Sequence, residues 1–181
     1  MKTKTKTISV AMAVAMSSAL DCGRVSAATT VQTIGDVLQI VLPTTAAGMT
    51  LYYKDRDGAI QFGESFALTM GVTYALKYSI NAERPNGGGQ SFPSGHTSAS
   101  FSSAEFIRKR YGWEFGVPAY ALATFVGYSR VESKQHYTRD VVAGAAIGVL
   151  SSYLFTKPYH GWEVELEGDS KGGGVKLTHQ F

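Results

Sequence analysis

Two basic residues stand seven positions apart, directly before a proline, in the stretch Lys77-Tyr-Ser-Ile-Asn-Ala-Glu-Arg84-Pro85. On a helix, a separation of seven residues falls about 20° short of two full turns, so both side chains share one face. Pro85 disfavours helical geometry at Arg84, which therefore marks the end of the predicted helix. A guanidinium presented at a helix end suits a bound anion. Two solvated cations that interact with the helix dipole are the alternative.

A short motif of small residues precedes the next predicted helix. Pro93-Ser94-Gly95-His96 lies directly before a helix that is expected to begin near Thr97. A helix N-terminus carries unpaired N–H groups and partial positive charge, which together can bind phosphate. Gly95 would let the backbone approach an oxyanion closely. Ser94 could donate its hydroxyl to the anion or cap the helix, and in the second case His96 would be an ordinary residue of the cap.

A third stretch pairs a histidine with a carboxylate. In Ser129-Arg130-Val-Glu-Ser-Lys-Gln-His136-Tyr-Thr-Arg-Asp140, His136 and Asp140 stand four residues apart at the start of a predicted helix. Side chains at that spacing can reach each other. An aspartate that holds one imidazole nitrogen fixes the tautomer and leaves the other nitrogen as a nucleophile or base. A structural histidine–carboxylate pair is the alternative.

Together, the three stretches predict a site for phosphoryl transfer. That reaction needs little except positioning and charge stabilisation, and cations at a helix N-terminus can supply both without a metal. The sequence shows no grouping of Asp, Glu and His with the spacing of a divalent-metal site. The aspartates outside these stretches are interpreted more simply as helix-end and turn residues: Asp36, Asp55 and Asp57.

The elements that must position these residues are predicted to be helices. The chain has 181 residues, of which 44% are hydrophobic, and this suits one domain. Apolar residues recur with helical spacing between proline-rich and glycine-rich breaks. The predicted helices cover residues 31–41, 46–53, 62–81, 98–110, 118–128 and 138–155, with a loop at 85–93. Pro43 is expected to end the first helix, and Asp55-Arg56-Asp57-Gly58 to form a turn.

Uninterrupted apolar runs after residue 28 are shorter than the roughly eighteen residues expected of a membrane-spanning helix. The longest candidate, Val141–Phe155, contains two glycines and two serines. The sequence therefore favours buried helices of a soluble bundle. Transmembrane helices are the alternative, because Gly and Ser also occur where membrane helices pack closely.

The first 28 residues have the organisation of a secretory signal peptide. A basic start precedes the apolar run Ile8–Leu20, and Ser26-Ala27-Ala28 provides a small-residue cleavage site. Without this leader, the 17 basic and 14 acidic residues become 13 of each, and the net charge falls from +3 to zero. Cys22 is lost as well, which excludes disulfides in the mature chain. We therefore expect an exported protein of the periplasm or cell envelope.

Apolar and polar residues alternate at the C-terminus, over 162–167 and 175–181, around the glycine-rich stretch 168–174. Period-two alternation on both sides of a break predicts a β-hairpin. This hairpin is expected to pack its apolar side on the helices. The predicted organisation is a signal peptide at 1–28, a helical domain at 29–159 and a hairpin appendage at 160–181.

The three motifs resemble the complete signature of the type 2 phosphatidic acid phosphatase superfamily. That superfamily also includes bacterial non-specific acid phosphatases and vanadium haloperoxidases. Lys77-x6-Arg84-Pro85, Pro93-Ser94-Gly95-His96 and Ser129-Arg130-x5-His136-x3-Asp140 match it at eleven positions, in order. The helical pattern extends the likeness to about residues 60–156. The resemblance implies an all-α helical bundle of the phosphatidic acid phosphatase/haloperoxidase type, to which the C-terminal hairpin is added.

The resemblance also implies a role for each matched residue. His136 would be the nucleophile that forms a phosphohistidine, Asp140 would orient it, and His96 would protonate the leaving oxygen. The other matched residues would bind phosphate oxygens: Lys77, Arg84, Ser94, Gly95 and Arg130. No metal or other cofactor is expected, and vanadate should act as an inhibitor. One histidine must be protonated and the other neutral, so a bell-shaped pH profile is expected.

The favoured function is a metal-independent phosphatase that acts on a phosphomonoester or pyrophosphate. A vanadium-dependent haloperoxidase using the same pocket is one alternative, with His136 holding vanadate. A non-catalytic envelope binding protein that docks through residues 160–181 is the other. The expected substrate is a phosphorylated lipid or a small phosphoester, with the lipid favoured. Peripheral contact with a membrane is expected, and contact with nucleic acid is not.

Overall fold

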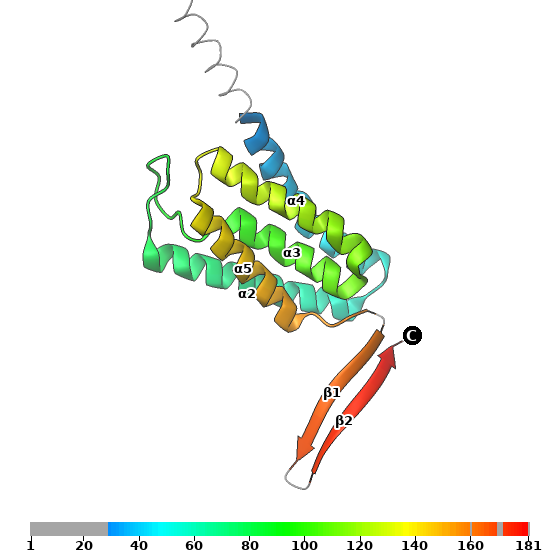
Figure 1. The fold of residues 1–181 in the computed structure, drawn as a ribbon. Helices are drawn as coiled ribbons and strands as arrows, with labels where there is room; N and C mark the ends of the chain where they lie inside the picture. Colours follow the sequence, from blue (N-terminus) through cyan, green and yellow to red (C-terminus); the bar gives the residue numbers. More distant parts are fainter. Residues whose placement is uncertain (1–28, 160, 170–171, 181) are drawn as a thin grey trace, which may run out of the picture.

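The computed structural model describes residues 29–159, 161–169 and 172–180. The helices in these residues are an N-terminal helix Thr29–Tyr52, α2 (Arg56–Ile80), α3 (Gly95–Tyr111), α4 (Trp113–Glu132) and α5 (Thr138–Phe155). Successive helices run in opposite directions, and α3 packs against α2, α4 and α5 (Figure 1). The predicted helical bundle is therefore confirmed. The predicted signal peptide lies outside the described residues.

The N-terminal helix continues through Pro43, so the prediction of two helices over 31–41 and 46–53 is wrong. A proline inside a helix costs about 3 kcal/mol, because it removes a hydrogen bond and crowds the preceding turn. Leu42 and Ala46, on either side of Pro43, are both buried in an apolar cluster with residues of α3 and α4. Packing on both sides of the proline therefore favours one continuous helix.

Three other helices begin earlier than predicted, and α3 does so by three residues, at Gly95. α2 begins at Arg56, inside the segment predicted as a turn, because the Asp55 carboxylate accepts a hydrogen bond from the Gly58 N–H at 2.8 Å and caps the helix. α4 begins at Trp113, so Pro118 lies inside the helix and not in its first turn. The bounds of α5 agree with the prediction. Local capping therefore decided one boundary that apolar periodicity alone could not place.

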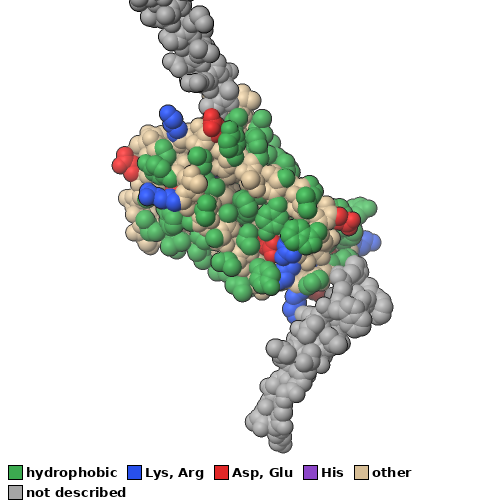
Figure 2. Space-filling model, viewed as in Figure 1, with side chains coloured by type: hydrophobic (Ala, Val, Ile, Leu, Met, Phe, Trp, Pro, Cys, Tyr) green, Lys and Arg blue, Asp and Glu red, His purple; other side chains and the backbone are tan. Residues whose placement is uncertain are grey.

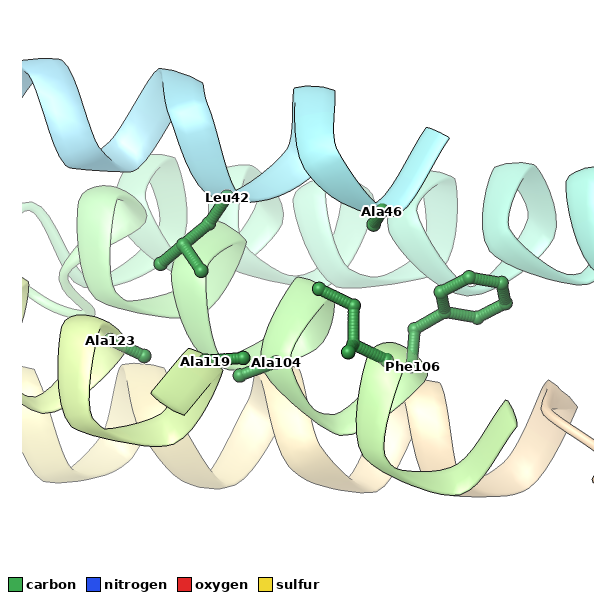
Figure 3. Close-up of a cluster of buried hydrophobic side chains, with 7 residues drawn as sticks. Leu42, Ala46, Ala104, Phe106, Ala119 and Ala123 are labelled. Carbon is green, nitrogen blue, oxygen red and sulfur yellow. The ribbon is translucent and has the colours of Figure 1, made fainter. Parts of the chain in front are cut away.

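Small and hydroxyl-bearing side chains fill much of the interior of the bundle. The fully buried serines and threonines include Ser65, Thr69, Thr73, Ser98, Ser102 and Ser152. Many of the hydroxyls bond within their own helix, as Thr69 does to the Ser65 carbonyl at 2.7 Å. The buried apolar cluster comprises Leu42, Ala46, Ala104, Phe106, Ile107, Ala119 and Ala123 (Figure 3). Four of these seven residues are alanines, so the helices approach one another closely.

Large apolar side chains lie mostly on the outside of the bundle. Exposed examples occur on the N-terminal helix, α2, α4 and α5: Ile40, Leu68, Phe115, Leu122, Val142 and Leu154. Apolar side chains cover much of the face seen in Figure 2. An apolar exterior around an interior of small residues is typical of helices that pack within a lipid bilayer. The surface therefore favours membrane-associated helices over the soluble bundle that the sequence was expected to form.

The N-terminal helix is long and apolar enough to cross a membrane. It has 24 residues and a mean hydropathy of 1.3, and 22% of its apolar window is buried within the structure. Counting uninterrupted apolar runs missed this helix, because Gln32, Asp36 and Thr44 interrupt the apolar residues along the chain. Whether a helix suits a membrane depends instead on the hydropathy averaged over its length.

Two glycines of α5 let this helix lie directly against the backbone of α3. A Cβ added at Gly144 would come within 2.6 Å of the Ser94 carbonyl oxygen, and one at Gly148 within 2.4 Å of the Ser98 carbonyl oxygen. These approaches are closer than carbon and oxygen can normally make. The packing therefore requires glycine at both positions. The close contact between the two helices holds the start of α3 against α5.

Replacing Gly148 with alanine is expected to destabilise the protein by about 1–3 kcal/mol, because the added methyl group must push α5 away from the α3 backbone. Thermal unfolding in detergent, followed by circular dichroism, measures the effect. Gly71→Ala is the matched control, since a Cβ there meets nothing within 4 Å and replaces glycine in the interior of α2. That control should be neutral or more stable. Equal melting temperatures for Gly148→Ala and wild type would contradict this packing.

The C-terminal strands β1 (Gly161–Asp169) and β2 (Gly172–Gln180) form the predicted antiparallel hairpin. The register places Val164 opposite Leu177. Among the elements from α2 onward that the structure describes, each strand packs only against the other. The expectation that the hairpin packs on the helices is therefore wrong, and Figure 1 shows the hairpin extending away from the bundle. The domain boundary at residue 160 stays a prediction.

Candidate active site

A cavity of about 530 Å³ is lined by residues from the end of α2 and the start of α3. These two helix ends lie on the left in Figure 1. One end of the cavity is polar and is lined by Lys77, Arg84, Gln90, Gly95, His96 and His136. The wall that leads away from this end is mostly apolar and includes Ile40, Pro43, Phe66, Met70, Tyr74 and Ala99. The cavity therefore contains residues from all three of the stretches that the sequence singled out.

Lys77 and Arg84 supply the positive charge of the cavity. Lys77 is buried in the last turn of α2, where its Nζ donates to the Gln90 carbonyl at 2.8 Å. α2 ends at Ile80, so the prediction that Arg84 marks the helix end and shares a helical face with Lys77 is wrong. Arg84 lies in the following loop, where its Nε donates to the Gly89 carbonyl at 3.0 Å. Burial, together with the charge of Arg84, lowers the pKa of Lys77 to about 8. Lys77 therefore stays largely cationic at neutral pH.

The N-terminus of α3 meets the cavity at Gly95, the first residue of that helix. Ser94 is fully buried and caps the helix, and its Oγ accepts a hydrogen bond from the Thr97 hydroxyl at 2.9 Å. Of the two roles considered for Ser94, capping is the one observed. The Ser94 N–H donates to the Asp140 carbonyl at 2.9 Å and ties α3 to α5. Gly95 brings the backbone to the cavity wall without a side chain.

His136 and Asp140 are brought together at the start of α5. His136 lines the cavity and is 3% exposed, and its Nδ1 lies 3.6 Å from Asp140 Oδ2. That distance is longer than a hydrogen bond, and Nδ1 has no other partner among the described residues. Asp140 is held in place because Oδ2 accepts from the Ser91 hydroxyl and from the Tyr137 N–H. A slight approach of the ring would complete the predicted pair.

Arg130 is a predicted phosphate ligand that the structure does not place in the cavity lining. It is 2% exposed in the last turn of α4, and its Nη1 donates to Asp36 Oδ1 at 2.7 Å. The same Asp36 oxygen lies 3.1 Å from His96 Nε2. Ser94 and Asp140 also stand behind the cavity wall, where they support residues that line it. The predicted residues therefore form one cluster, in which some residues line the cavity and others support them from behind.

Asp36 is the site residue that sequence reasoning missed, since it was interpreted as a helix-end residue. It lies inside the N-terminal helix, and its partners His96 and Arg130 are 60 and 94 residues away in the chain. Such separations leave no local spacing pattern. The available signal was a carboxylate in an otherwise apolar helix, because ionisable residues there are usually functional.

The surroundings lower the pKa of both site histidines. Burial has the largest effect on His136, followed by the charge of Lys77. Burial also has the largest effect on His96, followed by the charge of Arg130, while Asp36 opposes the lowering. A neutral His136 retains the lone pair that a nucleophile needs.

No group of three or more His, Cys, Asp or Glu side chains in the part of the chain that the structure describes could hold a metal ion. The cavity instead combines cations, a helix N-terminus and imidazoles. These groups can bind a phosphate, attack its phosphorus and donate a proton to a leaving oxygen. That combination is sufficient for phosphoryl transfer.

Comparison with known proteins agrees with this chemistry. Residues 58–162 match the family model described as the PAP2 superfamily. The chain is 33% identical over 167 residues to a lipid A 4'-phosphatase of Helicobacter pylori, which covers 82% of this chain and 84% of that relative. It is also 40% identical over 93 residues to a lipid A 1-phosphatase of Porphyromonas gingivalis, but this match covers 49% of the chain and 21% of the relative.

Two solved structures share the fold. One is the transmembrane PAP2 type phosphatidylglycerolphosphate phosphatase from Bacillus subtilis, with a TM-score of 0.56, 26% identity, and coverage of 72% of this chain and 73% of that one. The other is LpxE of Aquifex aeolicus, with a TM-score of 0.54, 22% identity, and coverage of 66% and 83%. The matched family model covers more than half of the chain and all three motifs. The protein therefore belongs to the PAP2 superfamily.

Proposed function

We propose that this phosphatase of the PAP2 type hydrolyses a lipid-linked phosphomonoester in the cavity, without a metal. The two-part lining of the cavity is the observation that carries the proposal. Lys77, Arg84 and His136 gather at one end, while Phe66 and Met70 line the wall that leads away from it. A lipid phosphate has the same division between a charged head and an apolar chain. The head would bind at the cations, with the chain along the apolar wall.

The first chemical step transfers the phosphoryl group to His136. The lone pair of an imidazole nitrogen forms a bond to phosphorus as the ester P–O bond breaks. His96 donates its proton to the leaving oxygen, so the lipid departs as an alcohol and not as an alkoxide. Lys77, Arg84 and the N-terminus of α3 stabilise the charge on the phosphoryl oxygens. Asp140 would stabilise the cationic ring of His136 once the two have approached.

The second step releases phosphate and restores the enzyme. His96, now neutral, accepts a proton from a water molecule as the water oxygen bonds to phosphorus. The P–N bond to His136 breaks, and its electron pair returns to the imidazole nitrogen. Inorganic phosphate leaves, and both histidines regain their starting protonation states. Each proton is accounted for within this pair of histidines and the water.

The relatives support a lipid substrate. Matched proteins include lipid A 4'- and 1-phosphatases and the lipid phosphate phosphatase 1 of Arabidopsis thaliana. The first of these matches covers most of both chains. A phosphorylated lipid is therefore the substrate class to test first, with lipid A among the candidates.

A membrane or envelope location agrees with the surface of the protein and with its relatives. The helices carry exposed apolar side chains, and the N-terminal helix is long enough to cross a bilayer. The charged end of the cavity lies where α2 ends and α3 begins. The head of a membrane lipid could therefore reach the cations while its chain stays in the hydrocarbon.

We infer that the site faces the outer side of the cytoplasmic membrane. Removal of the predicted leader, residues 1–28, would leave Thr29 on the side to which proteins are exported. Asp36 lies about two turns after Thr29 on the N-terminal helix and contacts His96. Thr29 therefore lies near the end of the bundle that holds the site. Accessibility of a cysteine placed at Thr30 to a membrane-impermeant thiol reagent in whole cells tests this orientation.

Phosphate release from matched substrates tests the proposed function. The full chain in detergent micelles is given dilauroyl phosphatidic acid or glycerol 3-phosphate, each with and without EDTA. We expect kcat/KM about 100-fold higher for the lipid, which corresponds to burial of three or four methylenes at about 0.8 kcal/mol each. Equal rates on both substrates would overturn the lipid assignment. Loss of activity in EDTA would overturn metal independence.

The two alternatives predict different results in the same assays. A haloperoxidase would oxidise halide with peroxide after vanadate is added, whereas a phosphatase would be inhibited, because vanadate resembles the transferring phosphoryl group. A binding protein would be inert towards every phosphoester and would retain a partner through residues 160–181. Phosphate release that vanadate inhibits would exclude both alternatives.

The pH dependence of kcat/KM should be bell-shaped, with its maximum below pH 6.5, the ordinary pKa of histidine. His136 must be neutral, and its lowered pKa keeps it neutral into the acid range. His96 must be protonated, and its lowered pKa means that activity falls before the pH reaches 6.5. Initial rates across the acid and neutral range measure both limbs. A flat profile, or one that rises above pH 6.5, would contradict these roles.

Replacing Gly95 with alanine separates phosphate binding from folding. A Cβ at this position would lie 3.7 Å from Lys77 Cε and 3.8 Å from Thr73 Cγ2, which are ordinary contacts. The variant should therefore fold with unchanged or slightly higher stability, since alanine suits a helix better than glycine. The new methyl group would occupy the cavity where the phosphate approaches the backbone, and kcat/KM should fall about 10- to 100-fold. Unchanged kcat/KM would show that phosphate does not bind here.

A further inference from the structure

Asp36 contacts both Arg130, a predicted phosphate ligand, and His96, the predicted proton donor. Its Oδ1 accepts from Arg130 Nη1 at 2.7 Å and lies 3.1 Å from His96 Nε2. Arg130 is buried, whereas the Asp36 side chain is 45% exposed. Asp36 comes from the N-terminal helix, outside residues 58–162 that match the family model. The family signature therefore assigns it no role.

We propose that Asp36 is a positioning residue that holds His96 in the protonated state and orientation needed to protonate the leaving group. This proposal rests on the phosphatase function proposed above. Asp36 acts through His96 and Arg130 and does not itself exchange a proton with the substrate. The helix that carries it is therefore part of the catalytic apparatus and not only a membrane anchor.

The shared oxygen determines which nitrogen of His96 carries a proton. An ionised carboxylate can only accept hydrogen bonds, so the contact requires a proton on His96 Nε2. The Arg130 guanidinium reaches the same oxygen and fixes the direction of the carboxylate. Asp36 would therefore keep the imidazole from turning and would favour its cationic form, as an aspartate does for a catalytic histidine in other enzymes.

The charges around His96 make this support necessary. Arg130 approaches from α4, Arg84 from the loop after α2, and Lys77 and His136 line the same cavity. Burial and the charges of the two arginines all disfavour a positive charge on the His96 ring, and burial has the largest effect on the pKa of His96. Asp36 raises this pKa by its charge and its hydrogen bond. Without Asp36, His96 would lose its proton at a lower pH.

The position of Asp36 is fixed by close packing of the N-terminal helix against α4. A Cβ added at Gly35 would lie 2.0 Å from Ser129 Oγ and 2.8 Å from Arg130 Nη2, so only glycine permits this approach. The Gln32 carbonyl accepts a further hydrogen bond from Arg130 Nη2 at 2.8 Å. Contacts from Gln32, Gly35 and Asp36, within little more than one helical turn, thus hold the Asp36 carboxylate beside the Arg130 guanidinium.

The test compares two leaving groups in Asp36→Asn, in the full chain in detergent micelles. Dodecyl phosphate releases a basic alkoxide that needs a general acid, whereas p-nitrophenyl phosphate releases a stable phenolate that does not. We expect kcat/KM at neutral pH to fall about 10- to 100-fold more for dodecyl phosphate than for p-nitrophenyl phosphate. The alkaline limb of the pH profile should move to lower pH. Asp36→Glu, which keeps the carboxylate, should keep the alkaline limb.

Asp57→Asn is the matched control, because Asp57 is exposed in the first turn of α2, at the other end of the bundle. It should leave both the leaving-group ratio and the pH profile unchanged. The ratio of kcat/KM on the two substrates and the pH of the alkaline limb do not depend on how much of a variant is folded. Equal losses on both substrates, with an unmoved alkaline limb, would overturn the proposal and leave Asp36 a structural role. Absence of phosphate release by wild type would instead overturn the proposed function.

Discussion

Replacing His136 with alanine should reduce kcat by about 10⁴-fold or more, because no other group can form the covalent intermediate. The cavity lining offers His136 as the neutral imidazole among its cations, while His96 is tied to Asp36. The remaining cations would still bind phosphate, so KM should change far less than kcat. Steady-state rates with dilauroyl phosphatidic acid give both constants.

The loss should not reflect unfolding. His136 Nδ1 has no hydrogen-bond partner among the described residues, so truncation of the ring breaks no hydrogen bond at that atom. Thr138→Ala is a suitable control, since this residue is exposed at the start of α5, on the same loop end. Thr138→Ala should keep wild-type kcat. A His136→Ala protein that keeps more than about a hundredth of kcat would show that another residue attacks phosphorus.

Replacing Arg110 with alanine should destabilise the protein by about 3–5 kcal/mol, because it leaves a buried carboxylate without its partner. Asp55 is 5% exposed and Arg110 6% exposed, and two hydrogen bonds join them. The Tyr111 hydroxyl donates to Asp55 as well, at 3.0 Å. Arg110 Nη1 also donates to the Lys157 carbonyl at 2.8 Å, so the pair ties α2, α3 and the segment after α5 together.

Chemical denaturation of the detergent-solubilised chain measures this loss, with Arg56→Ala as the control because Arg56 is exposed one residue from Asp55. The double variant Asp55→Ala/Arg110→Ala should lose less stability than the two single variants together, since it leaves no unpaired charge. The pair lies at the opposite end of the bundle from the cavity, so kcat per folded molecule should be unchanged. A loss below about 1 kcal/mol for Arg110→Ala would show that the pair is replaceable by solvent.

The residues around the cavity could be predicted because each of their signals is local. Pro85 shows where α2 must end, and Ser94 and Gly95 have the pattern of a helix N-terminus. His136 lies just before α5, and Asp140 lies in the first turn of that helix. The structure brings these stretches together, although Arg130, Ser94 and Asp140 lie behind the cavity lining. Ser94 caps its helix, and Asp140 is still a slight distance from its histidine.

Asp36 and the surface of the bundle could not be predicted in the same way. The role of Asp36 depends on Gly35, which lets one helix approach another that is distant in sequence. The apolar exterior depends on which side of each helix faces its neighbours, and the glycines and serines of α5 lie inside while Val142 and Leu154 lie outside. Pro43 does not end its helix, because residues on both sides of it pack against the bundle. Each of these features arises from tertiary contact and leaves no periodic pattern in the sequence.

A phosphohistidine at His136 can be trapped and detected. A lipid phosphate labelled with radioactive phosphorus is mixed with the full chain, and the reaction is stopped by rapid denaturation in alkali, in which phosphohistidine survives. We expect label on the wild-type protein, its release by acid, and its absence from His136→Ala under the same conditions. Label that persists on His136→Ala, or wild-type protein that turns over without acquiring any, would contradict this expectation.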